Sequence, residues 1–109
     1  MVNWLKTKND FEAFRKSKSY QTPQVRIRVR SQANQNSPRF GFIVPKKVLA
    51  KATDRNLIKR RIKFFLTKNL AKIRPVDILI FPNSQLFKKK FSELELELTS
   101  LFSKANLWK

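Results

Sequence analysis

Apolar and basic residues alternate strictly from Val25 to Arg30. Because side chains of a β-strand point alternately to its two faces, this stretch predicts a strand with one buried face and one arginine face. Like charges crowded on one face lower stability, and either solvent or a bound phosphate strand would offset that cost. The apolar positions are Val25, Ile27 and Val29, and the basic positions are Arg26, Arg28 and Arg30.

Two more stretches predict strands. Arg39 to Val44 contains Gly41, the only glycine of the chain, and a glycine inside a strand suggests a bulge or a close backbone approach. The polar segment 31–37 before it predicts a loop, which we interpret as a hairpin connection between the first two strands. Val76 to Phe81 is a short apolar run around Asp77 and predicts a largely buried third strand.

Helical periodicity predicts the remaining elements. A main helix starts near Asp54, as N-cap or first-turn acid, and stops before Pro75. A last helix starts at about Leu86 and keeps its glutamates off its apolar stripe, so we expect it to be scaffold. A short N-terminal helix carries Phe11 and Phe14 on one side. The apolar stripe of the main helix is Ile58, Ile62, Phe65, Leu66 and Ile73, and that of the last helix is Phe87, Phe91, Leu94, Leu98, Leu101, Phe102 and Ala105.

These elements follow one another as helix, strand, strand, helix, strand, helix. The order predicts an α/β fold, a two-layer α+β sandwich in which helices cover a mixed sheet. The length of 109 residues fits one domain, so we expect residues 1–109 to form a single unit.

The charge balance indicates that the protein binds a polyanion. The chain has 25 Lys and Arg against 7 Asp and Glu, a net charge of +18, and Asp54 is the only acid between Glu12 and Asp77. A merely basic soluble protein needs far less charge. Such a surface repels itself unless a polyanion neutralises it, and nucleic-acid backbones do so with release of counterions.

The residues that are absent exclude most catalytic chemistry. Without Cys or His there is no disulfide, no thiolate zinc site and no histidine base. Three glutamates of the last helix, Glu93, Glu95 and Glu97, splay around it, and one glycine cannot build a phosphate loop. We therefore predict no catalytic residue, no metal site and no small-molecule substrate. No stretch has the length of a membrane span or a signal peptide, which predicts a cytoplasmic protein without a membrane partner.

The main helix carries the most specific binding signal. Its second face gathers Asn56, Lys59, Arg60 and Lys63, whereas Leu57, Arg61 and Phe64 share a third side. Arg55 lies in line with the apolar stripe, at the helix start. Guanidinium groups bind phosphates and an amide can contact bases or sugars. The pattern alone does not choose between RNA, DNA and an anionic membrane.

In combination, several motifs resemble the bacterial ribonuclease P protein subunit over nearly the whole chain. The run RNLIKRR, Arg55 to Arg61, is similar to the Arg-Asn-Arg helix motif of that family. FGFIVPKK, Phe40 to Lys47, is similar to its Gly-x-x-Val-x-Lys-Lys element, and AKATDRN follows at Ala50. NDFEAF, VDILIF and LTSLF resemble its first helix, closing strand and closing helix.

The resemblance implies a function and a partner. In that family a catalytic RNA, holding Mg²⁺, removes the 5′ leader of precursor tRNA, and one protein binds each RNA. The fold implied contains a left-handed βαβ crossover. Carried over by position, leader binding falls to Phe11, Phe14, Arg26, Arg28 and Arg30, and catalytic-RNA binding to Lys46, Lys47, Lys51, Arg55, Asn56, Lys59, Arg60, Arg61 and Lys63.

Two positions depart from the family pattern. Leu57 replaces the second Arg of the motif, and Arg61, one turn further on, is a candidate to replace it in part. Arg28 stands where some members have an aromatic residue, which favours charge pairing over base stacking there. Two other functions remain alternatives, a structural RNA-binding protein of the ribosomal type and an autonomous nuclease.

Overall fold

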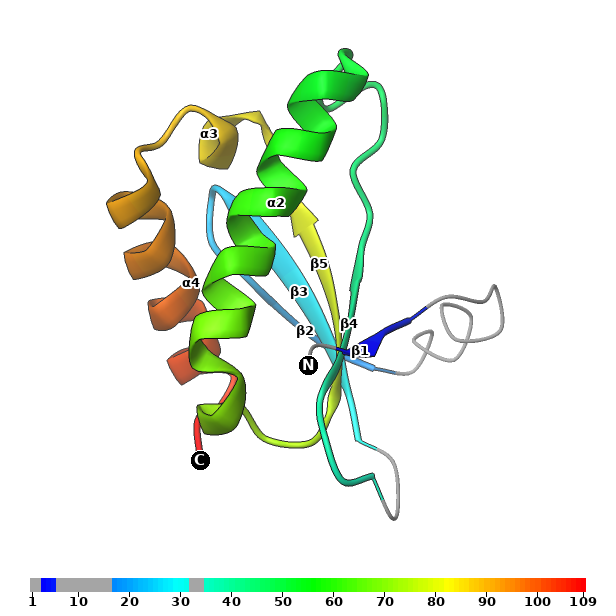
Figure 1. The fold of residues 1–109 in the computed structure, drawn as a ribbon, viewed down its shortest axis with the longest axis vertical. Helices are drawn as coiled ribbons and strands as arrows, with labels where there is room; N and C mark the ends of the chain where they lie inside the picture. The colour runs from blue at the N-terminus through cyan, green and yellow to red at the C-terminus, as the bar shows by residue number, and fades with distance from the viewer. Residues whose placement is uncertain (1–2, 6–16, 32–34) are drawn as a thin grey trace.

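The computed structural model describes residues 3–5, 17–31 and 35–109. Within these residues one mixed sheet has the strand order β1-β4-β5-β3-β2. Helices cover one face of this sheet (Figure 1). The strands are β1 (Asn3–Trp4), β2 (Lys18–Gln21), β3 (Val25–Arg30), β4 (Arg39–Phe42) and β5 (Asp77–Pro82), and the helices are α2 (Ala52–Asn69), the 3₁₀ turn η2 (Leu70–Lys72), α3 (Ser84–Phe87) and α4 (Phe91–Lys104).

The sheet corrects one prediction about connectivity. β5 lies between β3 and β4, pairing antiparallel with β3 and parallel with β4. Segment 31–37 is therefore no hairpin connection. The hairpin joins β2 to β3 instead, and Thr22 closes its turn by accepting hydrogen bonds from the backbone N–H of Gln24 and Val25. β5 is buried along nearly its whole length, because it is the central strand of the sheet and both of its faces are covered.

The parallel pair β4 and β5 is joined through α2. In Figure 1, with α2 toward the viewer, the chain rises through β4 on the right and returns to β5 on its left. This βαβ unit is thus left-handed, against the usual right-handed preference. The fold is the α+β sandwich that the sequence predicts, with the crossover that the resemblance implies.

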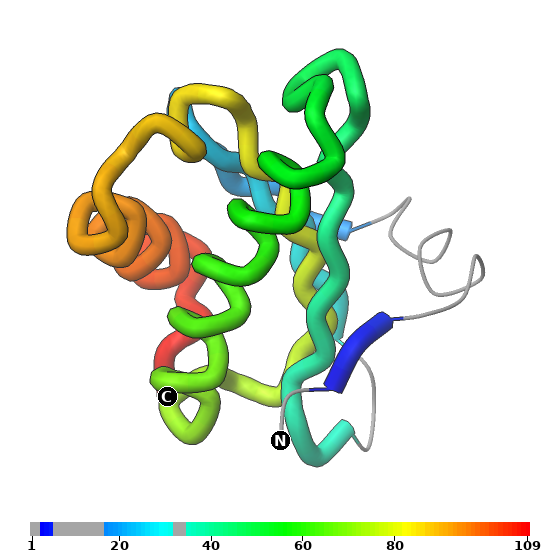
Figure 2. The backbone as a smooth tube through the Cα atoms, turned by 45° about the horizontal axis from the view of Figure 1, so that its top comes forward, coloured from blue at the N-terminus to red at the C-terminus, as the bar shows by residue number. Residues whose placement is uncertain are grey.

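The core lies between the sheet and the two long helices. Figure 2 shows α2 and α4 on one side of the strands, with β1 at the outer edge beside β4. The C-terminal residues return to the end of α2, where Lys109 N–H donates to Lys72 O at 2.8 Å. Central side chains that are fully buried come from both layers, namely Ile27, Phe40, Ile58, Ile62, Leu66, Ile78, Ile80, Leu94, Leu98 and Phe102.

Local details sharpen or correct the predicted elements. Asp54 lies in the first turn of α2, and Lys51 is the N-cap residue. Gly41 pairs in regular register with Leu79, so the strand has no bulge there. The predicted last helix is two helices, because Lys90 is extended and separates α3 from α4. Of the helices in the described part of the chain, none is long and apolar enough to cross a bilayer.

Candidate nucleic-acid interface

One side of α2 presents the polar residues that the sequence grouped together. Asn56, Arg60 and Lys63 are exposed and Lys59 is half-buried, and we call these four residues the basic face. Another side of the helix, about a third of a turn away, packs Ile58, Ile62, Phe65 and Leu66 into the core. The core contacts therefore fix the rotation of α2, and that rotation turns the basic face outward. Among the ion pairs of the described residues, none involves the basic face.

An aromatic residue of β1 lies beside the basic face. The ammonium of Lys63 is 5.0 Å from the ring centroid of Trp4, a cation–π distance. Trp4 in turn contacts Phe42 at 5.6 Å between ring centroids. Lys59 and Lys63 line a small hollow with these rings, of about 240 Å³. The sequence pattern does not indicate this strand, because a two-residue strand leaves no periodic signal.

Arg55 lies apart from the basic face. Its Nη1 donates to the carbonyl oxygens of Leu49 and Ala50, at 2.8 and 2.9 Å. Hydrogen bonds from a charged group to carbonyls hold the loop before α2 against the start of the helix. The guanidinium therefore has a structural task, although its remaining N–H groups can still donate to a phosphate.

Arg61 also has a partner inside the protein. Its Nη1 donates to Phe87 O at 3.2 Å, and its guanidinium lies 5.6 Å from the Phe87 ring centroid. Arg61 thus bridges α2 to α3. The structure leads us to expect little replacement of the missing motif arginine at Leu57, because Arg61 is turned toward α3.

The predicted loop lysines flank the start of α2. Lys46, Lys47 and Lys51 are all exposed, and Lys46 and Lys47 lie in a turn closed by Val48 and Leu49 N–H donating to Pro45 O. Lys47 also lines a groove of about 420 Å³ with Arg26 and Phe81. This loop therefore joins the basic face of α2 to the open face of the sheet.

The open face of the sheet carries the arginines of β3, as predicted. The guanidinium of Arg26 lies over the Phe81 ring, with its Cζ 4.4 Å from the centroid, and Arg28 Nε donates to Ser17 Oγ at 3.0 Å. The predicted leader-binding residues Phe11 and Phe14 lie outside the described residues. A small apolar cluster that the sequence analysis missed lies on this face and consists of Leu5, Leu79, Ile43 and Phe81.

Arg30 is bound to a buried acid. Asp77 is fully buried and accepts hydrogen bonds from Arg30 Nη2 at 3.1 Å and from Gln35 Nε2 at 2.9 Å. Arg39 adds a bidentate pair, with Nε at 2.8 Å and Nη2 at 2.7 Å. The predicted leader residue Arg30 therefore already neutralises a carboxylate, which reduces what it can offer to a phosphate.

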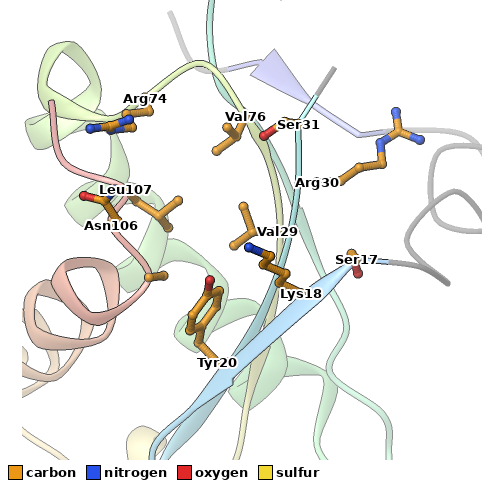
Figure 3. A pocket seen from close by; sticks show the side chains of 11 residues that line it. Ser17, Lys18, Tyr20, Val29, Arg30, Ser31, Arg74, Val76, Asn106 and Leu107 are labelled. Carbon is orange, nitrogen blue, oxygen red and sulfur yellow. The ribbon is translucent and has the colours of Figure 1, made fainter. Parts of the chain in front are cut away.

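A separate groove of about 580 Å³ runs between the β2 edge and the C-terminal segment. Figure 3 shows Lys18 and Tyr20 of β2 facing Asn106 and Leu107, whereas Arg30 points away from the groove. Arg74 adds a further cation, and among the described residues no carboxylate lines the groove. No sequence pattern indicates this groove, because its walls come from segments far apart in the chain.

These surfaces present cations beside aromatic rings. In the described part of the chain no group of three His, Cys, Asp or Glu side chains could hold a metal ion. Asp77, the one fully buried acid among the described residues, is hydrogen-bonded to two arginines and an amide. The basic face and the loop lysines together can grip a polyanion.

Comparisons with known proteins agree on one family. The ribonuclease P family model matches residues 2–106. The ribonuclease P protein component of Bacillus velezensis is 30% identical over 108 residues, covering 98% of this chain and 92% of that protein. The component from Synechocystis is 30% identical over 105 residues, covering 94% and 85%. The ribonuclease P protein of Staphylococcus aureus superposes with a TM-score of 0.90 over 100% of both chains, at 21% identity, which shows the fold.

Proposed function

This chain belongs to the ribonuclease P protein family, and we propose that it is the protein subunit of bacterial ribonuclease P. In this proposal it binds the catalytic RNA and the 5′ leader of precursor tRNA. It thereby assists the endonucleolytic cut that gives the mature 5′ end of the tRNA. The proposal includes a cytoplasmic location and one protein for each RNA.

The observation that carries the proposal is the basic face of α2. Asn56, Lys59, Arg60 and Lys63 project from one side of a helix whose core-facing side is held by Ile58, Ile62, Phe65 and Leu66. Cations without carboxylate partners release counterions from RNA when they bind phosphates, and each contact adds affinity at low salt. The amide of Asn56 adds a group that can hydrogen-bond to a base or a sugar. We assign this face, with Lys46, Lys47 and Lys51, to the catalytic RNA.

We assign the open face of the sheet to the leader. Arg26 and Arg28 lie there next to an apolar cluster that includes the half-buried ring of Phe81. Cations beside aromatic and apolar side chains bind single strands with little sequence preference. Lys47 shares a groove with Arg26 and connects this face to the loop before α2, so one RNA strand could pass between the two surfaces.

We assign the chemistry to the RNA. Hydrolysis of a phosphodiester needs metal ions or general bases, and the described residues offer neither a carboxylate cluster nor a histidine. Mg²⁺ ions held by the catalytic RNA supply that chemistry. The protein contributes charge neutralisation, which lowers the Mg²⁺ concentration that the folded complex requires, and affinity for the leader.

The test is reconstitution. The purified chain is added to a bacterial catalytic RNA and a precursor tRNA at low magnesium, and 5′ cleavage is measured. We expect a clear gain in rate with the protein and no cleavage by the protein alone. No gain, together with co-sedimentation of the chain with ribosomal subunits, would favour the ribosomal alternative. Cleavage without RNA, abolished by a carboxylate substitution, would favour the autonomous nuclease.

A further inference from the structure

A large aromatic side chain is exposed on α2 next to the basic face. The side chain of Phe64 is 60% exposed, although it stands in the middle of a helix whose other apolar residues are mostly buried. Its ring meets Phe91 of α4 edge-on, with centroids 5.4 Å apart and an interplanar angle of 74°. The edge contact covers one side of the Phe64 ring and leaves the rest accessible to a ligand.

Phe64 lies in a shallow hollow with basic neighbours. Arg60, Arg61, Phe64 and Phe91 line an open hollow of about 370 Å³. The hydrogen bond from Arg61 to Phe87 O holds its guanidinium toward α3, so the apolar part of the side chain lines the hollow. Lysines 88–90 form the connection between α3 and α4, and two of these three, Lys88 and Lys90, are exposed.

This combination fits one kind of ligand. Aromatic rings and guanidinium planes stack on a nucleobase, and every base has a face that can stack. The neighbouring cations fit the phosphates on either side of such a base. The surface of a protein partner would have to be strongly acidic to approach this site, and the hollow holds a single ring rather than the face of a helix.

We propose that Phe64 and Phe91 form a stacking site for one unpaired nucleobase of the RNA that the basic face binds. The inference rests on the proposed function, because that function supplies the RNA. Phe64 lies on α2, on the helix-covered side of the sheet, whereas the proposed leader surface is the open side. The stacking site is therefore separate from the leader surface. It adds a contact that is independent of phosphate charge.

The test measures binding of the full-length protein to the catalytic RNA over a range of salt concentrations. Four single variants are compared with the wild type: Phe64→Ala, Phe64→Leu, Phe64→Trp and Leu96→Ala. Leu96 is the matched control, since it is 71% exposed on α4 and has no arginine of α2 beside it. Thermal unfolding of each variant shows whether the fold is retained.

We expect Phe64→Ala to weaken binding about 5- to 150-fold, which is the range for loss of one base–aromatic stack. The slope of log affinity against log salt should stay unchanged, because no phosphate contact is removed. Phe64→Leu, which keeps apolar packing against Phe91, should be as weak as Phe64→Ala. Phe64→Trp, which keeps an aromatic ring, should retain wild-type affinity, and Leu96→Ala should bind as the wild type does.

Wild-type affinity of Phe64→Ala, or of Phe64→Leu, would overturn the stacking site while leaving the proposed function intact. A wild-type protein that fails to bind the catalytic RNA at all would instead overturn the proposed function. If RNA binding is unchanged and Phe64→Ala abolishes co-purification of an acidic protein, the site belongs to a protein partner and the inference is wrong.

Discussion

The basic face of α2 and the open face of the sheet both gather cations, and they differ in what these cations contact. On α2, Lys59 and Arg60 have no carboxylate partner among the described residues. On the sheet, Arg30 and Arg39 meet the buried carboxylate of Asp77. The number of cations in a segment therefore does not give the charge that is available to a ligand, because some of these cations are paired within the protein.

Strand register explains why the sheet arginines are committed. Both Arg30 of β3 and Arg39 of β4 stand directly opposite Asp77 of the central strand β5. A buried carboxylate is costly unless hydrogen bonds and opposite charges compensate it, and a bidentate arginine is the strongest such partner. Asp77 therefore clamps three strands together at one end of the sheet.

The largest effect that we predict is on stability, at Asp77. The substitution Asp77→Asn removes the negative charge and leaves two partly buried arginines uncompensated. We expect the free energy of unfolding to fall by about 3 kcal/mol, the lower end of the range for a broken buried pair, since both arginines are partly exposed and can be rehydrated. Urea unfolding followed by circular dichroism measures this loss.

The exposed pair of Lys68 with Glu95 is the control for Asp77. Its Nζ–Oε2 distance is 3.2 Å, and the lysine side chain is well exposed. Glu95→Gln should change the unfolding free energy by less than about 1 kcal/mol. Equal effects of the two substitutions would mean that the Asp77 cluster is no clamp, and that the sheet arginines are as available as those of α2.

The next largest effect is on RNA affinity, at the basic face. A triple variant, Lys59→Ala, Arg60→Ala and Lys63→Ala, should lower the slope of log affinity against log salt by roughly 2 units. At about 0.1 M salt this corresponds to a loss of about a hundredfold in affinity. Binding of the catalytic RNA is measured by titration. Stability should change little, because these side chains are largely exposed.

A second triple variant separates a site from bulk charge. Lys72, Lys104 and Lys109 are exposed at the C-terminal ends of the helices and at the chain end. Replacing all three by Ala removes the same charge from a different region. We expect at most a small loss of affinity. An equal loss in both triple variants would show that RNA responds only to net charge.

Arg55 and Asn56 are adjacent in the sequence, but Arg55 is hydrogen-bonded within the protein whereas Asn56 is exposed on the basic face. Arg55→Ala removes two hydrogen bonds from a charged group to Leu49 and Ala50 carbonyls. We expect it to lower the unfolding free energy by about 2 kcal/mol. Asn56→Ala should leave stability within about 0.5 kcal/mol and weaken RNA binding. Unfolding and binding measured on both single variants give the result, and the reverse pattern would contradict it.

Sequence periodicity predicted the regular elements well. The alternation in β3 and the apolar stripe of α2 with Ile58 and Ile62 both repeat over a few neighbouring residues, so they can be recognised in the sequence. β2 was missed because its sequence, KSYQ, lies at the sheet edge and has no alternation. The insertion of β5 between β3 and β4 was missed because a strand pattern does not specify which strand becomes its partner.

The candidate site was predictable to the same extent. The basic face follows from helical spacing alone, as does its separation from Ile58 and Ile62. The commitment of Arg30 to Asp77 joins residues 47 positions apart and depends on register. The contact of Arg61 with Phe87 depends on how α3 docks against α2. Such pairings belong to tertiary structure, and one sequence does not contain a signal for them.

The smallest predicted effect tests the boundary between the two regions, at Lys63. This lysine belongs to the basic face, yet its ammonium lies 5.0 Å from the Trp4 ring centroid. An exposed cation–π contact is worth about 0.5 kcal/mol, so Lys63→Met, which keeps the apolar stem, should cost about that much stability. If Lys63 also contacts a phosphate, the salt slope of RNA binding should fall by about 0.7 to 0.9. An unchanged slope with reduced stability would place Lys63 with the internally committed cations of the sheet, and would limit the basic face to Asn56, Lys59 and Arg60.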